Sequence, residues 1–204
     1  MRTAIFGGTF DPIHSAHLEM GRRAADQFRL DRVLFIPAGN PPHKHAEVSF
    51  EDRYRMVELG CAADPRFVAS RLEEGAGKSY SIDTIERVKA AGADAANAGT
   101  NNALFFIIGS DAFAEIQTWH RWEDVIRAVE FIVVARPGHE IAGPPGARVH
   151  RLDNVELPVS SSDIRDALAR GESPEELPPA IAEYIREHRL YGLARGHLNP
   201  RAGV

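Results

Sequence analysis

Residues 3–17 read TAIFGGTFDPIHSAH, and this stretch decides the fold. Its first four residues are β-branched, small or aromatic, a pattern typical of a strand, and they stop at Gly7-Gly8. A helical pattern begins near Ala16. A strand that passes through a glycine turn into a helix is typical of the first βα unit of a parallel sheet.

The same alternation continues along the chain. Further strand patterns occupy residues 32–37, 66–70, 104–108 and 131–135, and helical patterns occupy 16–28, stretches from Ser49 and from Ser81, 111–117, 122–128, 162–170 and 179–188. Most of the strand patterns are continuously apolar, as in strands that are covered on both faces. We therefore predict an α/β fold: a Rossmann-like, doubly wound and mostly parallel sheet with helices on both faces, which binds ligands at the carboxyl ends of its strands.

The chain of 204 residues is long enough for one domain with a sizeable core. We predict a single domain over residues 1–191, whose late helical part covers about 160–191, followed by a flexible tail over 192–204. The repetitive stretch 90–102 is expected to be a surface connection. The sequence leaves the oligomeric state open.

The composition excludes several classes of protein. With 24 basic and 29 acidic residues the formal net charge is −5, which argues against broad binding to nucleic acid or to anionic membranes. No apolar stretch is long enough for a membrane span, and no signal segment opens the chain, so we expect a cytoplasmic protein. The single cysteine, Cys61, allows neither an intrachain disulfide nor a thiolate zinc site, and we interpret it as a core residue.

The glycine turn carries the first candidate site. Gly7 and Gly8 let the backbone approach a ligand, and the following helix start supplies unpaired N–H groups. His14 and His17 are three residues apart, so both can face one side of that helix start. We predict a phosphate site here, since neither G-x-G-x-x-G nor a P-loop lysine is present. The alternative is a plain turn with two surface histidines.

A second candidate site lies at residues 159–165, which read VSSSDIR. The three serines can cap a helix, and their hydroxyls can also donate to an anion. Arg165 follows on the first turn and can share that anion by bidentate donation. We predict that Ser161, Ser162 and Arg165 bind the same phosphate chain as the glycine turn. A plain helix cap with a solvated arginine is the alternative.

These motifs carry a resemblance. GGTFDPIH-x-x-H followed by SS-x-x-IR resembles the HxGH nucleotidyltransferase superfamily. Further segments are Pro-Pro-His-Lys at 41–44, SYSIDT at 79–84, IGSD at 108–111 with Trp119 after it, and Leu190-Tyr191. Together they are similar to bacterial nicotinate-nucleotide adenylyltransferase, and the similarity spans residues 3 to about 191. The resemblance implies that ATP, carrying Mg²⁺, reacts with nicotinate mononucleotide to give deamido-NAD and pyrophosphate.

The resemblance also implies roles for individual residues. It places ATP against Gly7, Gly8, Thr9, Phe10, His14, His17, Gly109, Asp111, Arg136, Ser161, Ser162 and Arg165. It places nicotinate mononucleotide against Gly8, Thr9, Lys44, Tyr80, Ser81, Thr84 and Trp119. His14, His17, Lys44 and Arg165 are the expected catalytic residues, and no protein metal site is expected because the magnesium is carried by ATP.

Some of these roles have structural alternatives. Asp111 can accept from the ribose hydroxyls or cap a helix, Lys44 can be a solvated loop residue, and Trp119 can be a core residue. Where the family has a glycine this chain has Ala16, which adds a methyl group where phosphates approach the backbone. Where it has a threonine this chain has Ser81, which keeps the hydroxyl and the N–H group.

Other functions also fit parts of the sequence. A histidine-rich zinc enzyme is one, because His14 and His17 have a spacing that can ligate zinc. A nucleotide-binding module without catalysis is another. A sister transferase acting on nicotinamide mononucleotide or phosphopantetheine is the third.

Overall fold

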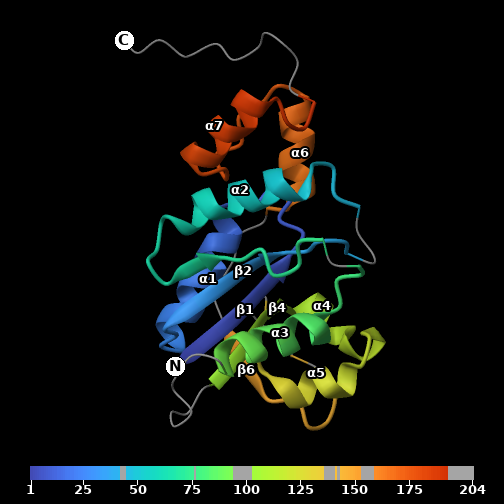
Figure 1. Ribbon diagram of the computed structural model, residues 1–204. Helices are drawn as coiled ribbons and strands as arrows, with labels where there is room; N and C mark the ends of the chain where they lie inside the picture. Colours follow the sequence, from blue (N-terminus) through green and yellow to red (C-terminus); the bar gives the residue numbers. More distant parts are fainter. Residues whose placement is uncertain are drawn as a thin grey trace.

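The computed structural model describes residues 1–41, 45–75, 77–93, 103–135, 141, 143–152 and 159–192. Its centre is a six-stranded sheet with the strand order β3-β2-β1-β4-β5-β6, in which every neighbouring pair is parallel (Figure 1). The strands are β1 (Arg2–Gly8), β2 (Arg32–Pro37), β3 (Phe67–Ala69), β4 (Ala103–Gly109), β5 (Glu130–Val134) and β6 (Val149–Leu152). The α/β prediction is confirmed.

Helices cover both faces of the sheet. They are α1 (Ser15–Gln27), α2 (Phe50–Cys61), α3 (Ser81–Ala93), α4 (Ser110–Ala114), the 3₁₀ turn η1 (Ile116–Thr118), α5 (Trp122–Ala128), α6 (Ser161–Ala169) and α7 (Pro179–His188). One core cluster joins the sheet to α1, α2, α6 and α7, and the other joins it to α3, α4 and α5. Successive residues of β1 show the division, since Ala4 belongs to the first cluster and Ile5 to the second.

The strand order reverses between β1 and β4. From β1 the chain moves outward to β2 and β3, then returns to β4 on the other side of β1 and continues outward to β5 and β6. The carboxyl ends of the two central strands, at Gly8 and Gly109, therefore diverge into connections on opposite faces. This is the position where open α/β sheets bind ligands.

Most predicted elements agree with the structure to within two residues. Three details differ. β6 has no strand signal in the sequence because only Leu152 of its four residues is buried. The stretch 111–117 is not one helix, because α4 ends at Ala114 and is followed by η1. α3 continues to Ala93, into the expected surface connection, the rest of which (94–102) lies outside the described residues. The domain boundary at 191 stays a prediction, since 193–204 also lie outside them.

A charged side chain lies in the buried stripe of α2. The buried stripe of α2 consists of Arg53, Met56, Val57, Gly60 and Cys61. Cys61 is a core residue as predicted, and burial raises the pKa of its thiol to about 12. A fully buried arginine in the same stripe was not anticipated.

Candidate active site

The glycine turn after β1 is tightly folded. The Phe10 ring lies against Gly8, where an added Cβ atom would approach it to 3.0 Å. Phe10 itself has φ 49°, a left-handed conformation that is costly for a residue with a side chain. The turn therefore holds its backbone in one strained arrangement, which is the behaviour expected of a ligand-binding loop.

His14 and His17 lie together at the start of α1, with ring centroids 3.8 Å apart. The backbone N–H group of His14 donates to Nδ1 of the His17 ring at 3.3 Å. Because Nδ1 accepts, a neutral His17 ring carries its hydrogen on Nε2, which makes that atom a donor. The predicted pairing of the two imidazoles at one helix start is confirmed.

Burial determines the protonation state of His14 in the protein without ligand. Its side chain is buried, its Nδ1 has no hydrogen-bond partner, and burial lowers the pKa of the imidazole to about 4. Desolvation penalises the charged ring, and the adjacent His17 offers no compensating charge. His14 is therefore a neutral group at pH 7 in the protein alone.

The start of α6 docks directly on the glycine turn. Ser160 caps the helix by accepting from the Asp163 N–H group at 3.2 Å. Ser161 Oγ donates to the carbonyl of Pro12 at 2.9 Å, and Arg165 Nη1 donates to the carbonyl of Asp11 at 2.8 Å. The two segments predicted to bind phosphate, about 150 residues apart in sequence, thus lie against each other.

Asp11 connects this edge to two further segments. Its Oδ1 accepts from the Tyr191 hydroxyl at 2.7 Å, and its Oδ2 accepts from the Glu47 N–H group at 2.7 Å. Glu47 also pairs with Arg165, whose Nε lies 2.6 Å from Glu47 Oε1. The turn is therefore held from the loop before α2, from α6 and from the chain after α7.

A cleft of about 250 Å³ opens at the carboxyl ends of β1, β2 and β4. Its lining includes Gly7, Gly8, Ser81, Thr84, Gly109 and Trp119. Trp119 is half-buried and meets Phe106 edge-on, so it is neither a free surface residue nor sealed in the core. The cleft brings together residues predicted for both substrates.

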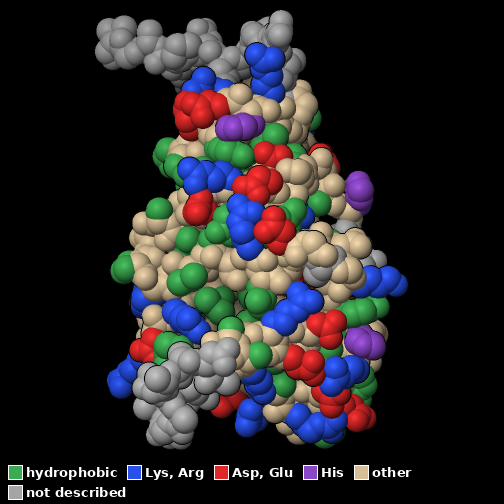
Figure 2. Space-filling view, in the orientation of Figure 1, with side chains coloured by type: hydrophobic (Ala, Val, Ile, Leu, Met, Phe, Trp, Pro, Cys, Tyr) green, Lys and Arg blue, Asp and Glu red, His purple; other side chains and the backbone are tan. Residues whose placement is uncertain are grey.

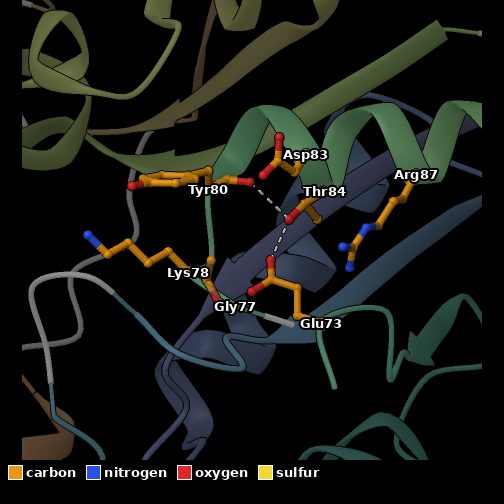
Figure 3. Close-up of a pocket in the computed structure, with 8 residues that line it drawn as sticks. Glu73, Gly77, Lys78, Tyr80, Asp83, Thr84 and Arg87 are labelled. Atoms are coloured by element: carbon orange, nitrogen blue, oxygen red, sulfur yellow. Dashed lines mark hydrogen bonds between the residues drawn. The ribbon is translucent and has the colours of Figure 1, made fainter. Parts of the chain in front are cut away.

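The start of α3 forms one wall of this cleft and of a neighbouring cavity of about 220 Å³ (Figure 3). The N–H groups of Asp83 and Thr84 both donate to the carbonyl of Tyr80. Among the described residues, the N–H groups of Ser81 and Ile82 have no partner. These two amides are the available donors at this helix start.

The remaining predicted residues have separate outcomes. Asp111 is exposed in the first turn of α4, whose N-cap is Gly109, so Asp111 is not the cap. Ala16 is fully buried, so its methyl group is not exposed on the surface of the protein without ligand. Lys44 and Arg136 lie outside the described residues.

Two buried charged residues near the cleft are not predicted from the sequence: Glu73 lines the cleft and Arg53 does not. Arg53 is buried in α2, and Glu73 is buried between β3 and α3, where it contacts Thr84. A signal for Arg53 existed, because it stands in the apolar register three and four residues before Met56 and Val57. Glu73 gave no such signal, since it sits in a polar connection.

Three other kinds of protein receive no support from the described residues: a metal enzyme, a membrane-spanning protein and a nucleic-acid-binding protein. Within the described residues no group of three His, Cys, Asp or Glu side chains could hold a metal ion. In the same residues no helix is both long and apolar enough to cross a bilayer. Acidic and basic side chains are interspersed over the face drawn in Figure 2, which is unlike the basic surface that nucleic acid requires.

Known proteins resemble this chain over nearly its full length. A cytidylyltransferase-like family model matches residues 5–167. The probable nicotinate-nucleotide adenylyltransferase of Solibacter usitatus is 56% identical, over 94% of this chain and 100% of that protein. This chain belongs to the nicotinate-nucleotide adenylyltransferase family. The probable family member of Citrifermentans bemidjiense is 41% identical, over 96% of this chain and 100% of the relative.

Solved structures agree on the fold. Nicotinic acid mononucleotide adenylyltransferase of Plasmodium falciparum, in complex with NaAD, superposes with a TM-score of 0.77. The match covers 95% of this chain and 98% of the other at 19% sequence identity. At this identity the likeness establishes the doubly wound architecture of the family, while the residue roles rest on the geometry of this chain.

Proposed function

We propose that this chain transfers the adenylyl group of ATP to the phosphate of nicotinate mononucleotide, forming deamido-NAD and pyrophosphate. One observation carries the proposal beyond family membership. The start of α6 is hydrogen-bonded to the glycine turn through Ser161 and Arg165, beside the cleft at the strand reversal. Two sets of anion donors thereby share one edge with a pocket for a second substrate.

The chemistry needs little from the protein in the way of proton transfer. The attacking phosphate monoester has a second pKa of about 6, so at neutral pH it is largely a dianion and needs no general base. Its oxygen attacks the α-phosphorus in line, and the bond to the pyrophosphate oxygen breaks. Positioning and stabilisation of negative charge therefore supply most of the acceleration.

The donors at the turn suit this task. Nε2 of His17 is assigned to the α-phosphate, because the hydrogen bond at Nδ1 leaves Nε2 as the donor. Arg165, Ser161 and Ser162 are assigned to the phosphates that leave. ATP is expected to enter as its magnesium complex, since Mg²⁺ commonly keeps several waters and is held by substrate phosphates. We also assign Lys44 to the phosphates, Asp111 to the ribose and Arg136 to the adenine.

The cleft supports the choice of acceptor. The open amides of Ser81 and Ile82 at the positive end of α3 can donate to the pyridine carboxylate. The half-buried Trp119 can stack on the ring. A pyridine amide would bring its own N–H donors to these amides, so we assign a preference for the acid. Use of ATP fits the expected cytoplasmic location.

Pyrophosphate release with a panel of acceptors tests the proposal. Purified protein with Mg-ATP should release pyrophosphate with nicotinate mononucleotide, and much more slowly with nicotinamide mononucleotide or phosphopantetheine. Preference for another acceptor would establish a sister transferase. ATP binding without pyrophosphate release by any acceptor would leave only a nucleotide-binding module.

A further inference from the structure

Arg53 occupies an unusual position behind the glycine turn. Its side chain is 2% exposed, and its Nη1 donates to the carbonyls of Thr9 and Ala38, each at 2.8 Å. Nε is buried without a hydrogen-bond partner. Within the described residues the polar contacts of this guanidinium are thus made to carbonyls and not to a carboxylate. Burial lowers the pKa of the guanidinium, and the charges of Asp11 and Glu73 nearby offset this effect only in part, so the buried cation has a cost.

Glu73 holds the same backbone unit from the opposite side. The carbonyl of Ala38 accepts from Arg53, and the N–H of Gly39, in the same peptide plane, donates to Glu73 Oε2 at 3.3 Å. Gly39 is required at this point, because an added Cβ atom would lie 2.1 Å from the carbonyl oxygen of Glu73. The peptide between Ala38 and Gly39 is therefore clamped between a buried cation and a buried anion.

The clamp extends to the proposed acceptor wall. Glu73 Oε1 accepts from the Thr84 hydroxyl, and Figure 3 shows the two side chains meeting beneath the start of α3. Glu73 and Thr84 also line the cleft, whereas Arg53 does not. Glu73 thus fixes the start of α3 relative to the end of β2.

Arg53, at the other end of the clamp, fixes the orientation of a peptide in the glycine turn. Because a trans peptide directs its C=O and N–H groups oppositely, fixing the Thr9 carbonyl on Arg53 directs the Phe10 N–H group away from the core. That N–H group has no partner among the described residues. Arg53 therefore determines the direction of a free donor in the turn.

We propose that Arg53 and Glu73 are positioning residues which, through the peptide between them, fix the spacing of the phosphate turn and the acceptor wall. The proposal deepens the adenylyltransferase function and rests on it. Neither residue is assigned a contact with substrate. Arg53 acts on both substrates because it holds the turn, and Glu73 acts mainly on the acceptor.

Four single variants, together with the double variant of Arg53 and Glu73, distinguish a positioning role from a purely structural one. Arg53→Met removes the charge at similar length, Arg53→Lys keeps the charge but loses the planar fork, and Glu73→Gln keeps the shape with one acceptor oxygen. Val125→Ala is the control, because Val125 is fully buried in the other core cluster and lines neither cleft nor cavity. Each is measured by thermal unfolding, by calorimetric affinity for a non-hydrolysable ATP analogue, and by steady-state kinetics.

We expect Val125→Ala to lose stability and keep wild-type affinity in its folded state. Arg53→Met should bind the analogue about 10-fold or more weakly and lose about 100-fold in kcat/KM, with partial recovery in Arg53→Lys. Glu73→Gln should raise KM for the acceptor about 10-fold while analogue affinity changes little. Because both residues hold one peptide, the double variant that combines Arg53→Met with Glu73→Gln should lose less kcat/KM than the product of the two single losses.

Two results would overturn the inference. The first is an Arg53→Met protein that, like Val125→Ala, is only less stable and binds the analogue normally when folded. The second is a double variant whose loss equals the product of the single losses. Failure of the proposed function is distinguishable, because wild-type protein would then release no pyrophosphate with nicotinate mononucleotide, while the analogue affinities would still report on the clamp.

Discussion

His17 is the residue on which the chemistry depends most. Its Nδ1 accepts from the backbone N–H group of His14, so a neutral ring carries its hydrogen on Nε2, and that atom can donate to a phosphate as charge develops. Replacement of one such donor typically costs about 3 kcal/mol of barrier. We predict that His17→Ala lowers kcat by about 100-fold or more while the affinity for ATP changes far less. Single-turnover kinetics beside equilibrium ATP binding measures both, and a variant with unchanged turnover would remove His17 from the mechanism.

His14 makes stability depend on pH. Its pKa is about 4 in the folded protein and about 6.5 when unfolded. As pH falls through 6.5, the His14 imidazole becomes protonated in the unfolded chain, whereas in the folded protein it stays neutral until about pH 4. The free energy of unfolding should therefore fall over this window, by up to about 3 kcal/mol. Denaturant unfolding of wild type and His14→Asn at several pH values tests this, and equal slopes in both proteins would contradict the assignment.

At the scale of elements, the ends of strands and the starts of helices carry the site. Gly8 and Gly109 end the two central strands, while α1, α3 and α6 begin at the cleft or at the turn beside it. The sequence predicts these elements well because continuous apolar runs and capping residues are local signals. It misses β6, whose four residues bury one side chain at the edge of the sheet and so carry no periodic signal.

The short segment after α4 offers a matched pair of tryptophans. Trp119 lines the cleft, whereas Trp122, also half-buried, packs against the core cluster that includes α3 and does not line the cleft. Stacking on an aromatic side chain contributes about 1–3 kcal/mol per base. Trp119→Ala should thus raise KM for the pyridine nucleotide about 10-fold or more and spare ATP. Trp122→Ala should lower stability and leave that KM unchanged. Equal effects of the two changes on acceptor KM would rule out stacking by Trp119.

Across the whole molecule, the chain after α7 is tied to the first turn. Tyr191 donates to Asp11, and burial raises the pKa of its phenol far above the usual range, so it stays a donor. Tyr191→Phe leaves a buried carboxylate oxygen without its partner, which should cost about 1–3 kcal/mol of stability. Tyr184→Phe is the control, since its bond to Asp52 is only part-buried and its loss should cost less. Chemical denaturation measures the stability of both variants. Equal losses would show that burial does not make the Tyr191–Asp11 bond more stabilising than the Tyr184–Asp52 bond.

The long-range part of the site was only partly predictable. The joint presence of the glycine turn and the serine–arginine helix start predicts that they meet, and the structure brings Arg165 onto Asp11. No local sequence pattern predicts that Tyr191 donates to Asp11 or that Glu73 accepts from Thr84. Such contacts depend on how distant elements pack, whereas motif reasoning identifies residues whose chemistry is recognisable on its own.

In the proposed mechanism, the turn at His14 and His17 and the start of α6 bind one triphosphate together. A crystal structure with magnesium and a non-hydrolysable ATP analogue tests this most directly. We predict that His17 contacts the α-phosphate and that Ser161, Ser162 and Arg165 contact the β- and γ-phosphates of the same molecule. A triphosphate bound by only one of the two segments, with the other left unengaged, would contradict the account.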